Sequence, residues 1–276
     1  MAMKKLLQTL KGRLVLLLKG YRYTCSVREA YRLAFLGPKY PDYQFQSHFN
    51  DLRYIFRWRD YYMVNEVLDQ AEYAPAKDLL KGSKSPFILD LGSNIGTFSL
   101  YFFHHFPQAR IHAYEASAAT YAVLNQNKDM NPQLDWHIFH AAAWKEDGAI
   151  SFENKAFSGG SFVSPNGKET VPALSLTTIL ASVPADSQVD LLKIDIEGAE
   201  EATLIGRDQE LSRIKTLVIE LHPHLCNTVA IAKMLRAHFG YLYALPNRQS
   251  SKPLLIASRQ PLTYPLYHVE DQAASP

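Results

Sequence analysis

The chain has 276 residues, 47% of them hydrophobic and 20% charged, with a formal net charge of +2. This is the composition of an ordinary globular protein with one large or two small domains, and the near-balanced charge gives no overall signature of nucleic-acid binding, so no nucleic-acid partner is expected. Cys25 and Cys226 have neither metal-binding nor redox spacing, and free thiols predict a cytoplasmic location.

The first 40 residues are strongly basic: nine Lys or Arg residues precede residue 40, and Glu29 is the only acid among them. Apolar residues recur at helical spacing from Met3 to Leu18, which predicts a basic amphipathic helix. Its apolar stripe either docks on the core or on a second subunit, or lies on an anionic membrane surface. Docking is the favoured interpretation, because Gly12 weakens an isolated helix.

No signal peptide or membrane span is predicted in this segment. The apolar run Leu14–Leu18 is too short for either, and no small-residue cleavage site follows Lys19. The expected location is the cytoplasm, with peripheral contact at the inner membrane face as the alternative. The sequence leaves the oligomeric state open.

Residues 40–80 are expected to complete an N-terminal helical cap or lid. Tyr40–Tyr62 combines many aromatics with three arginines. Such a mixture can stack on single-stranded RNA, but a lid that covers the substrate is the favoured interpretation. A helical pattern follows over Val64–Ala71. The polar segment Lys81–Pro86 is the expected linker, so the predicted division is 1–80, a main domain at 81–265 and a tail at 266–276, in which Glu270–Pro276 is expected to be disordered.

A buried strand at Phe87–Leu91 leads through a glycine-containing turn into the helical run Thr97–Phe106. Gly92 permits a sharp turn and a close approach to a ligand, and Gly96 lets the helix start lie close to a strand or ligand. Asp90 lies at the carboxyl end of the strand, where open parallel sheets bind ligands.

Three interpretations of this turn are open: an S-adenosylmethionine site, a dinucleotide site, and a plain ligand-free turn. The spacing Gly-x-Asn-x-Gly lacks the full Gly-x-Gly-x-x-Gly pattern of dinucleotide sites. An acid there suits a cationic, hydroxyl-bearing ligand better than a pyrophosphate. S-adenosylmethionine carries an ammonium, a sulfonium and ribose hydroxyls, and Asp90 is expected to accept from its amino acid end.

From Phe87 onward strands and helices alternate, which predicts a doubly wound, mostly parallel α/β sheet. The second strand, Ile111–Glu115, ends in an acid about 25 residues beyond Asp90, near the spacing at which acids bind ribose hydroxyls, so Glu115 is the predicted ribose ligand. Small residues, including Ala116 and Ala142, leave room for a flat base. The next strands are expected at Trp136–Phe139 and Ala149–Glu153.

A loop at Phe157–Phe162 is expected to cover the site, with a weakly predicted role for Ser161. Toward the C-terminus, a helix is predicted at Val229–Phe239, followed by a pair of strands at Tyr241–Leu245 and Leu254–Ala257.

Two further strands end in charged residues, which are costly there unless used or paired. Asp195 and Glu197 end one strand, and Glu220 and His222 end the other. A proton-accepting role is predicted for His222 or Asp195, with Glu197 and Glu220 orienting a substrate hydroxyl.

Two alternatives remain for this charged edge. Lys193 with a carboxylate can form a purely structural ion pair. Asp195 and Glu220, or His222 with His224, can hold a divalent metal, which is possible but not predicted.

These motifs together resemble the FkbM-type methyltransferases of the class I S-adenosylmethionine-dependent fold. The matching segments are Ile88–Gly96, Tyr114–Ala116, Asp190–Glu200 and Ile219–Pro223. The resemblance implies a Rossmann-like sheet of seven strands in the order 3-2-1-4-5-7-6, with the last strand antiparallel. It also implies methyl transfer to a hydroxyl oxygen of a sugar, glycan or secondary metabolite.

By the family pattern, Glu115 holds the ribose, and Gly92, Ser93, Asn94 and Gly96 bind the amino acid end of the cofactor. Asp195 is assigned to both the catalytic and the cofactor-binding residues. Ser117 and Ala118 stand where a proline often follows the acid of the second strand. The alternatives from other classes are an NAD(P)-dependent oxidoreductase and a non-catalytic cofactor-binding module.

Overall fold

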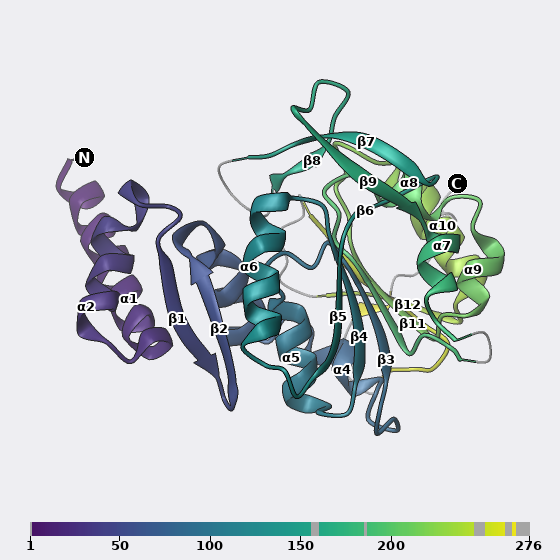
Figure 1. Ribbon diagram of the computed structural model, residues 1–276, viewed down its shortest axis with the longest axis horizontal. Helices are drawn as coiled ribbons and strands as arrows, with labels where there is room; N and C mark the ends of the chain where they lie inside the picture. The colour runs from purple at the N-terminus through teal and green to yellow at the C-terminus, as the bar shows by residue number, and fades with distance from the viewer. Residues whose placement is uncertain (1, 156–159, 185–186, 246–251, 263–266, 269–276) are drawn as a thin grey trace.

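The computed structural model describes residues 2–155, 160–184, 187–245, 252–262 and 267–268. Its central element is a sheet of eight strands in the order β14-β12-β13-β11-β10-β3-β4-β5 (Figure 1). The strands are β3 (Phe87–Leu91), β4 (Arg110–Glu115), β5 (Asp135–His140), β10 (Leu191–Ile194), β11 (Thr216–Glu220), β12 (Tyr241–Ala244), β13 (Leu254–Ser258) and β14 (Tyr267–His268).

This topology confirms the predicted sheet. Counted along the chain, β5-β4-β3-β10-β11-β13-β12 is the order 3-2-1-4-5-7-6, and β13 is antiparallel to both of its neighbours. β14 adds a short strand at the β12 edge, within the predicted tail but ahead of the residues expected to be disordered. The rest of that tail, residues 269–276, lies outside the described residues.

Each central strand sends alternate side chains into two separate cores, because successive residues of a strand face opposite sides of the sheet. Ile88 of β3 packs with α5 (Thr97–His105) and α6 (Ala118–Asp129). Leu89 and Leu91 pack with α7 (Leu176–Ala181), α9 (Asp208–Ser212) and α10 (Thr228–His238). The sheet is therefore covered on both faces, and β3, β10 and β11 are buried along their whole length.

A second, four-stranded sheet in the order β6-β9-β7-β8 lies near the carboxyl ends of the main strands, at the top of Figure 1. Its strands are β6 (Ala142–Trp144), β7 (Gly148–Glu153), β8 (Phe162–Val163) and β9 (Glu169–Ser175). Only β7 was predicted from the sequence. Ala142, Phe152 and Val171 form its small core.

The N-terminal region is helical, as predicted, but it also contains a β-hairpin that the sequence analysis did not predict. Its helices are α1 (Ala2–Thr24), α2 (Val27–Tyr31), α3 (Tyr61–Met63) and α4 (Ala74–Asp78), with shorter helical turns at Arg32–Leu36, Gly37–Lys39, Trp58–Asp60 and Val64–Asp69. The hairpin pairs β1 (Gln44–Phe49) with β2 (Leu52–Arg57). Asn50 in the connecting loop has a left-handed conformation with φ of 53°, which asparagine tolerates well.

The hairpin is fastened to α6 by two asparagine side chains rather than by another strand. Asn127 accepts a hydrogen bond from the Ile55 amide (2.7 Å) and donates to the Ile55 carbonyl (3.0 Å). Asn131 does the same with Arg53, at 3.1 and 2.7 Å. The free edge of β2 is thereby satisfied by buried amides, and the N-terminal region shares the core of the α5 and α6 face.

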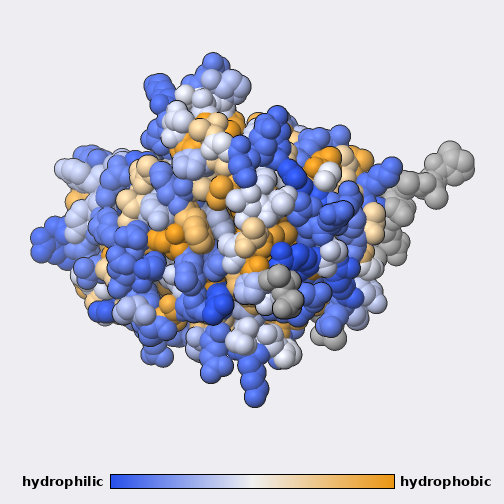
Figure 2. Space-filling model, turned by 45° about the vertical axis from the view of Figure 1, so that its right-hand side comes forward, coloured by the Kyte–Doolittle hydropathy of each residue, from blue (hydrophilic) through white to orange (hydrophobic). Residues whose placement is uncertain are grey.

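The surface is mixed in character. Figure 2 shows a face that is mainly hydrophilic, with apolar residues in separate groups near its middle. Within the described ranges, no helix has both the length and the apolar character needed to cross a membrane.

Candidate active site

A cavity opens at the carboxyl ends of β3, β4 and β10, where a doubly wound sheet binds its ligands. The N-terminal region contributes Met63, Val67 and Tyr73 to its wall, and the second sheet contributes Phe152 and Val163. Ala142 and Ala143 of β6 and Ser161, next to β8, also line it. The remaining lining residues lie in the main strands or shortly after them: Gly92, Ser93, Asn94, Thr97, Phe98, Tyr114, Glu115, Ala116, Ala141, Lys193, Asp195, Ile196, Glu197 and Ala199. Part of the predicted covering loop, residues 156–159, lies outside the described residues.

The turn after β3 depends on its two glycines for different reasons. Gly92 has a φ of 77°, and a Cβ there would lie 1.8 Å from the Asp195 carbonyl oxygen. The close approach predicted at Gly92 is thus an approach to the β10 loop. Gly96 has a φ of 90°, and a Cβ there would lie 2.5 Å from the Trp136 ring. Gly96 serves packing of the helix start and does not line the cavity, unlike Ser93 and Asn94.

Asp90 lies beneath the cavity floor rather than at its surface, which corrects its expected role as a direct ligand. Its carboxylate is fully buried, accepts a hydrogen bond from Ser99 (2.9 Å) and lies 3.3 Å from the ammonium of Lys193. The buried Lys193–carboxylate pair that the sequence left open is therefore present. Asp90 is positioned to act on a ligand through Lys193.

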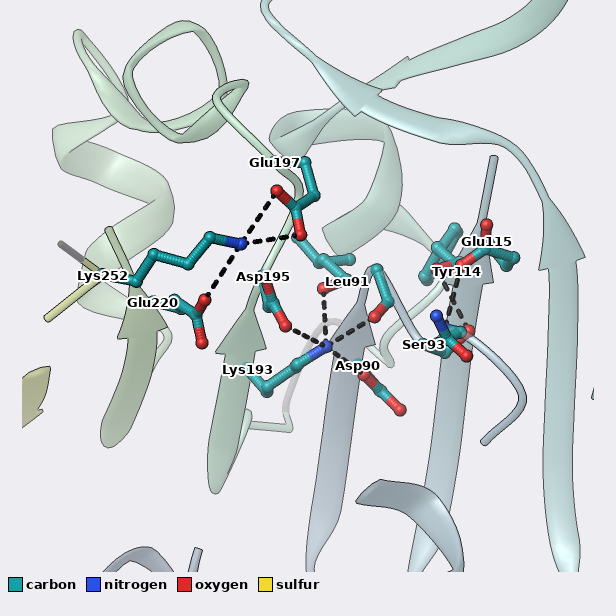
Figure 3. Close-up of polar contacts among 12 residues, drawn as sticks. Asp90, Leu91, Ser93, Tyr114, Glu115, Lys193, Asp195, Glu197, Glu220 and Lys252 are labelled. Carbon is teal, nitrogen blue, oxygen red and sulfur yellow. Dashed lines mark hydrogen bonds and ion pairs between the residues drawn. The ribbon is translucent and has the colours of Figure 1, made fainter. Parts of the chain in front are cut away.

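Lys193 is a buried charged residue at the wall of the cavity. It donates to the Gly92 carbonyl (2.5 Å) and lies 3.9 Å from the Asp195 carboxylate; Figure 3 shows it pointing between Asp195 and Asp90. Burial alone would lower the pKa of Lys193, but the carboxylates of Asp90 and Asp195 outweigh burial and raise that pKa. The ammonium is therefore charged at neutral pH.

Glu115 ends β4 with its carboxylate facing the cavity. One oxygen accepts from the Asn94 amide (2.9 Å) and the other from the Ser117 amide (2.8 Å). Each oxygen keeps a second lone pair for a ligand hydroxyl. Burial raises the pKa of Glu115 to about 7, although both backbone hydrogen bonds and Lys193 lower it. Ala116 and Ala142 line the cavity as predicted.

The pKa of Glu115 predicts a pH-dependent affinity for S-adenosylhomocysteine. If Glu115 binds the ribose as the sequence predicts, the affinity should fall roughly tenfold between about pH 8 and pH 6, because protonation removes that acceptor. The stability of the unliganded fold depends on pH in the opposite direction. Because folding raises the pKa of Glu115 from 4.5 to about 7, the contribution of Glu115 to the free energy of unfolding is lost as the pH rises from 4.5 to about 7. Calorimetric titration across this range tests the affinity. Glu115→Gln should abolish the slope, and an unchanged slope in that variant would contradict the assignment.

Beside the cavity, His222 is enclosed by acids. Its Nδ1 lies 2.8 Å from Glu200, and its Nε2 lies 3.0 Å from Glu197 and 3.7 Å from Glu220. Burial disfavours the charged imidazole, but Glu197 and Glu200 outweigh burial and raise the pKa of His222 to about 10. The predicted role of His222 as proton acceptor is therefore not supported, because both ring nitrogens already carry a proton at neutral pH.

Lys252 is a site residue that sequence analysis missed. Its ammonium lies 3.1 and 3.2 Å from the two oxygens of Glu197 and 3.5 Å from Glu220, as Figure 3 shows. No sequence motif surrounds Lys252. It lies just ahead of β13, 55 residues beyond Glu197 in the sequence, and its side chain reaches the site from there. Glu197 itself has a φ of 51°, which is unusual for a residue other than glycine and places its carboxylate toward Lys252.

One group of potential metal ligands occurs among the described residues. Ligand atoms of Asp195, Glu220 and His222 lie within 4.8 Å of one another. Each is already engaged with a cation or a proton: Asp195 with Lys193, Glu220 with Lys252, and His222 with its own second proton.

Comparison with known proteins identifies the family. The profile of the methyltransferase FkbM domain matches residues 90–243, which is more than half of the chain and runs from β3 to β12. The chain belongs to the FkbM methyltransferase family. The match includes the turn after β3 and the charged ends of β10 and β11.

Three similar proteins illustrate this family. Methyltransferase 1 of Beauveria bassiana is 28% identical over 205 residues, covering 63% of this chain and 81% of the relative. The hexuronic acid methyltransferase AglP of Haloferax volcanii is 28% identical over 148 residues, covering 52% of this chain and 59% of the relative. A crystal structure of methyltransferase FkbM from Methylobacillus flagellatus aligns with 84% of this chain and 59% of its own, at 15% identity and a TM-score of 0.47.

Membership in the FkbM family makes this protein an S-adenosylmethionine-dependent methyltransferase and decides against the NAD(P)-dependent oxidoreductase. The cavity suits the cofactor chemically. Glu115 offers an acceptor for hydroxyls, the alanines leave a flat space, and the charged Lys193 matches a carboxylate. Asp195 also has an oxygen, Oδ1, that is buried and without a hydrogen-bond partner among the described residues.

Proposed function

We propose that this FkbM methyltransferase methylates a hydroxyl oxygen on a sugar, a glycan or a secondary metabolite. The observation that carries the proposal is the carboxylate of Asp195. It lines the cavity, its side chain is 19% exposed, and its Oδ1 has no hydrogen-bond partner in the described part of the chain. A carboxylate in that condition is suited to accept a proton from a hydroxyl.

For the cofactor, the proposal assigns Glu115 to the ribose hydroxyls, the alanines at 116 and 141–143 to the adenine, and Ser93, Asn94 and Lys193 to the amino acid end. When bound, S-adenosylmethionine supplies a methyl carbon activated by the sulfonium. The protein then has to align an acceptor oxygen with that carbon and remove the acceptor's proton. Alignment can contribute several kcal/mol to lowering the barrier.

Asp195 is the proposed proton acceptor, since the raised pKa of His222 leaves that side chain without a free lone pair at neutral pH. The acceptor hydroxyl transfers its proton to Asp195 as its oxygen forms the new bond to carbon. Glu197 and Glu220 orient the acceptor by accepting from neighbouring hydroxyls, and Lys252 holds these two carboxylates in place. A polyhydroxylated acceptor such as a sugar fits this row of acids.

The relative from Haloferax volcanii supports a sugar acceptor, because it is named a hexuronic acid methyltransferase. At 28% identity it is too distant to transfer the acceptor itself. The acids beside Asp195 provide independent support for a hydroxyl-rich acceptor.

Two measurements test the proposed function. S-adenosylhomocysteine at about 100 times its dissociation constant should add roughly 2.7 kcal/mol of stability, which raises the melting temperature by several degrees, whereas NAD(P) should not. Sugars, glycans and metabolite extracts are then screened for a mass gain of one methyl group. Binding without methylation of any extract would favour a non-catalytic module, and methylation of nitrogen or carbon alone would refute the proposed acceptor.

We expect methyl transfer to be insensitive to chelators. Lys252 already lies against Glu220, and His222 is held by Glu197 and Glu200, so a divalent metal would have to displace both cationic groups. Turnover measured before and after EDTA treatment should agree within error. Loss of turnover that Mg²⁺ or Mn²⁺ restores would instead show that Asp195, Glu220 and His222 bind a metal.

A further inference from the structure

The outward face of α1 carries a continuous apolar stripe. Leu10, Leu14, Leu18 and Tyr21 are 53, 56, 65 and 53% exposed. Their spacing of four, four and three residues places them one above another on the same side of the helix. Val15 is exposed beside them. A row of this length is more than the scattered exposed apolar residues of an ordinary surface.

The opposite face of α1 is the one that holds the helix to the protein. Gly20 is buried so tightly that a Cβ there would lie 3.0 Å from the Ala30 backbone, and Tyr23 packs edge-on against Phe56. Lys19 and Arg22 both pair with Asp69. The favoured expectation is docking on the core or on a second subunit. Docking on the core is wrong for Leu10, Leu14 and Leu18, since the other side of α1 contacts the core.

Cations flank this stripe. Lys11 is exposed on α1, and Arg28 is exposed on the neighbouring α2. Arg22 pairs with Asp69, but its side chain remains 71% exposed. Up to residue 39 the chain has nine basic residues and one acid. An apolar stripe bordered by Lys and Arg is the pattern of a helix that lies in the plane of a membrane interface.

We propose that α1 binds the surface of an anionic lipid bilayer, with the stripe of Leu10, Leu14, Leu18 and Tyr21 inserted among the headgroups and the flanking cations at lipid phosphates. A second copy of the chain is a poorer occupant. A two-fold interface through this stripe would gather the flanking cations of both copies around one contact, and like charges across an interface oppose association. The inference does not depend on the acceptor proposed above.

Vesicle flotation of the full chain tests the proposal. The wild type should float with vesicles rich in phosphatidylglycerol, should not float with phosphatidylcholine alone, and should be released by raised salt. Leu14→Ser with Leu18→Ser should weaken binding roughly tenfold or more, because two exposed apolar side chains no longer insert. Both substituted residues are exposed, so the fold is expected to survive; circular dichroism and thermal unfolding check this.

The matched control is Ile205→Ser with Val229→Ser, which removes two apolar residues that are 45 and 77% exposed elsewhere on the surface. This variant should float like the wild type. Lys11→Gln with Arg28→Gln should bind several-fold more weakly. Equal flotation of the stripe variant and the wild type, or no flotation of the wild type with anionic vesicles, would overturn the proposal. A dimer in sedimentation velocity that the stripe substitutions dissociate would assign the face to a second copy instead.

Discussion

Asp195→Asn is expected to lower the rate of methyl transfer by roughly 10² to 10⁴, the usual contribution of a positioned proton acceptor. Asparagine has nearly the same size as aspartate and keeps an acceptor oxygen, but it cannot take up the proton of the acceptor hydroxyl. Steady-state turnover with the acceptor found in the screen measures the effect, and calorimetry measures binding of S-adenosylhomocysteine. A loss in turnover with binding retained is the expected combination.

Asp208→Asn provides a matched control, since Asp208 is largely exposed and pairs with His238 on the helical layer away from the cavity. It should leave turnover unchanged. If Asp195→Asn keeps full turnover, Asp195 is not the proton acceptor. If it loses S-adenosylhomocysteine binding as well as turnover, Asp195 acts mainly on the cofactor, the other role that its position allows.

Lys193→Met is expected to destabilise the fold by about 3–5 kcal/mol, because removing one partner of a buried ion pair leaves the other charge uncompensated. Lys193 and Asp90 have side chains that are 5 and 0% exposed, so water does not replace the lost partner. Methionine fills a similar volume, which keeps a packing defect small. Urea unfolding at about pH 8 measures the change in the free energy of unfolding.

The double variant Asp90→Asn with Lys193→Met separates charge from packing. Replacing both partners removes the unpaired charge, so the double variant should recover most of the stability that the single variant loses. A loss below about 1 kcal/mol in Lys193→Met would indicate that Asp90 takes up a proton when its partner is absent. A double variant no more stable than the single one would show that Lys193 acts through packing instead.

The sheet was predictable because its signals are local and repeated. The strands β3, β4, β10 and β11 are short, largely apolar runs that end at a glycine or a charged residue, and the alternation with helices selects a parallel sheet. The same signals place Glu115 and Asp195 at the carboxyl ends of β4 and β10, the two strands that flank β3, so both reach one cavity. Family resemblance supplied the exact strand order, which periodicity alone does not determine.

Three features of the site were not predictable, because they depend on residues far apart in the sequence. Lys252 meets Glu197 only after the chain has returned from β12. The protonation of His222 results from Glu197, in the loop after β10, and Glu200, at the start of the next helix. A histidine whose position in the sequence suggests a base is therefore an imidazolium. Asp90 sits behind Lys193 because the two residues pair across adjacent strands.

The hairpin could have been found from the sequence. Phe45 alternates with Gln44 and Gln46, and Asn50-Asp51, two residues typical of turns, separates this run from the apolar run that begins at Leu52. The aromatic and arginine content of this stretch indicates a segment that covers a ligand, and this signal masks the period of two that is typical of a strand. The α6 asparagines that fasten β2 carry no such signal, because a mid-helix asparagine usually faces solvent.

Asn127 and Asn131 also determine how the chain can be divided. Both side chains are buried, and each makes a two-way hydrogen bond with the backbone of β2. A chain that began at residue 81 would lose these hydrogen bonds and expose to water the apolar surface that the N-terminal region covers on α5 and α6, at a cost of several kcal/mol. The linker at residues 81–86 is therefore a boundary in sequence but not in folding. We expect the N-terminal region and the methyltransferase sheet to unfold as one cooperative unit. Deletions from the N-terminus should be tolerated only within α1, ahead of the hairpin.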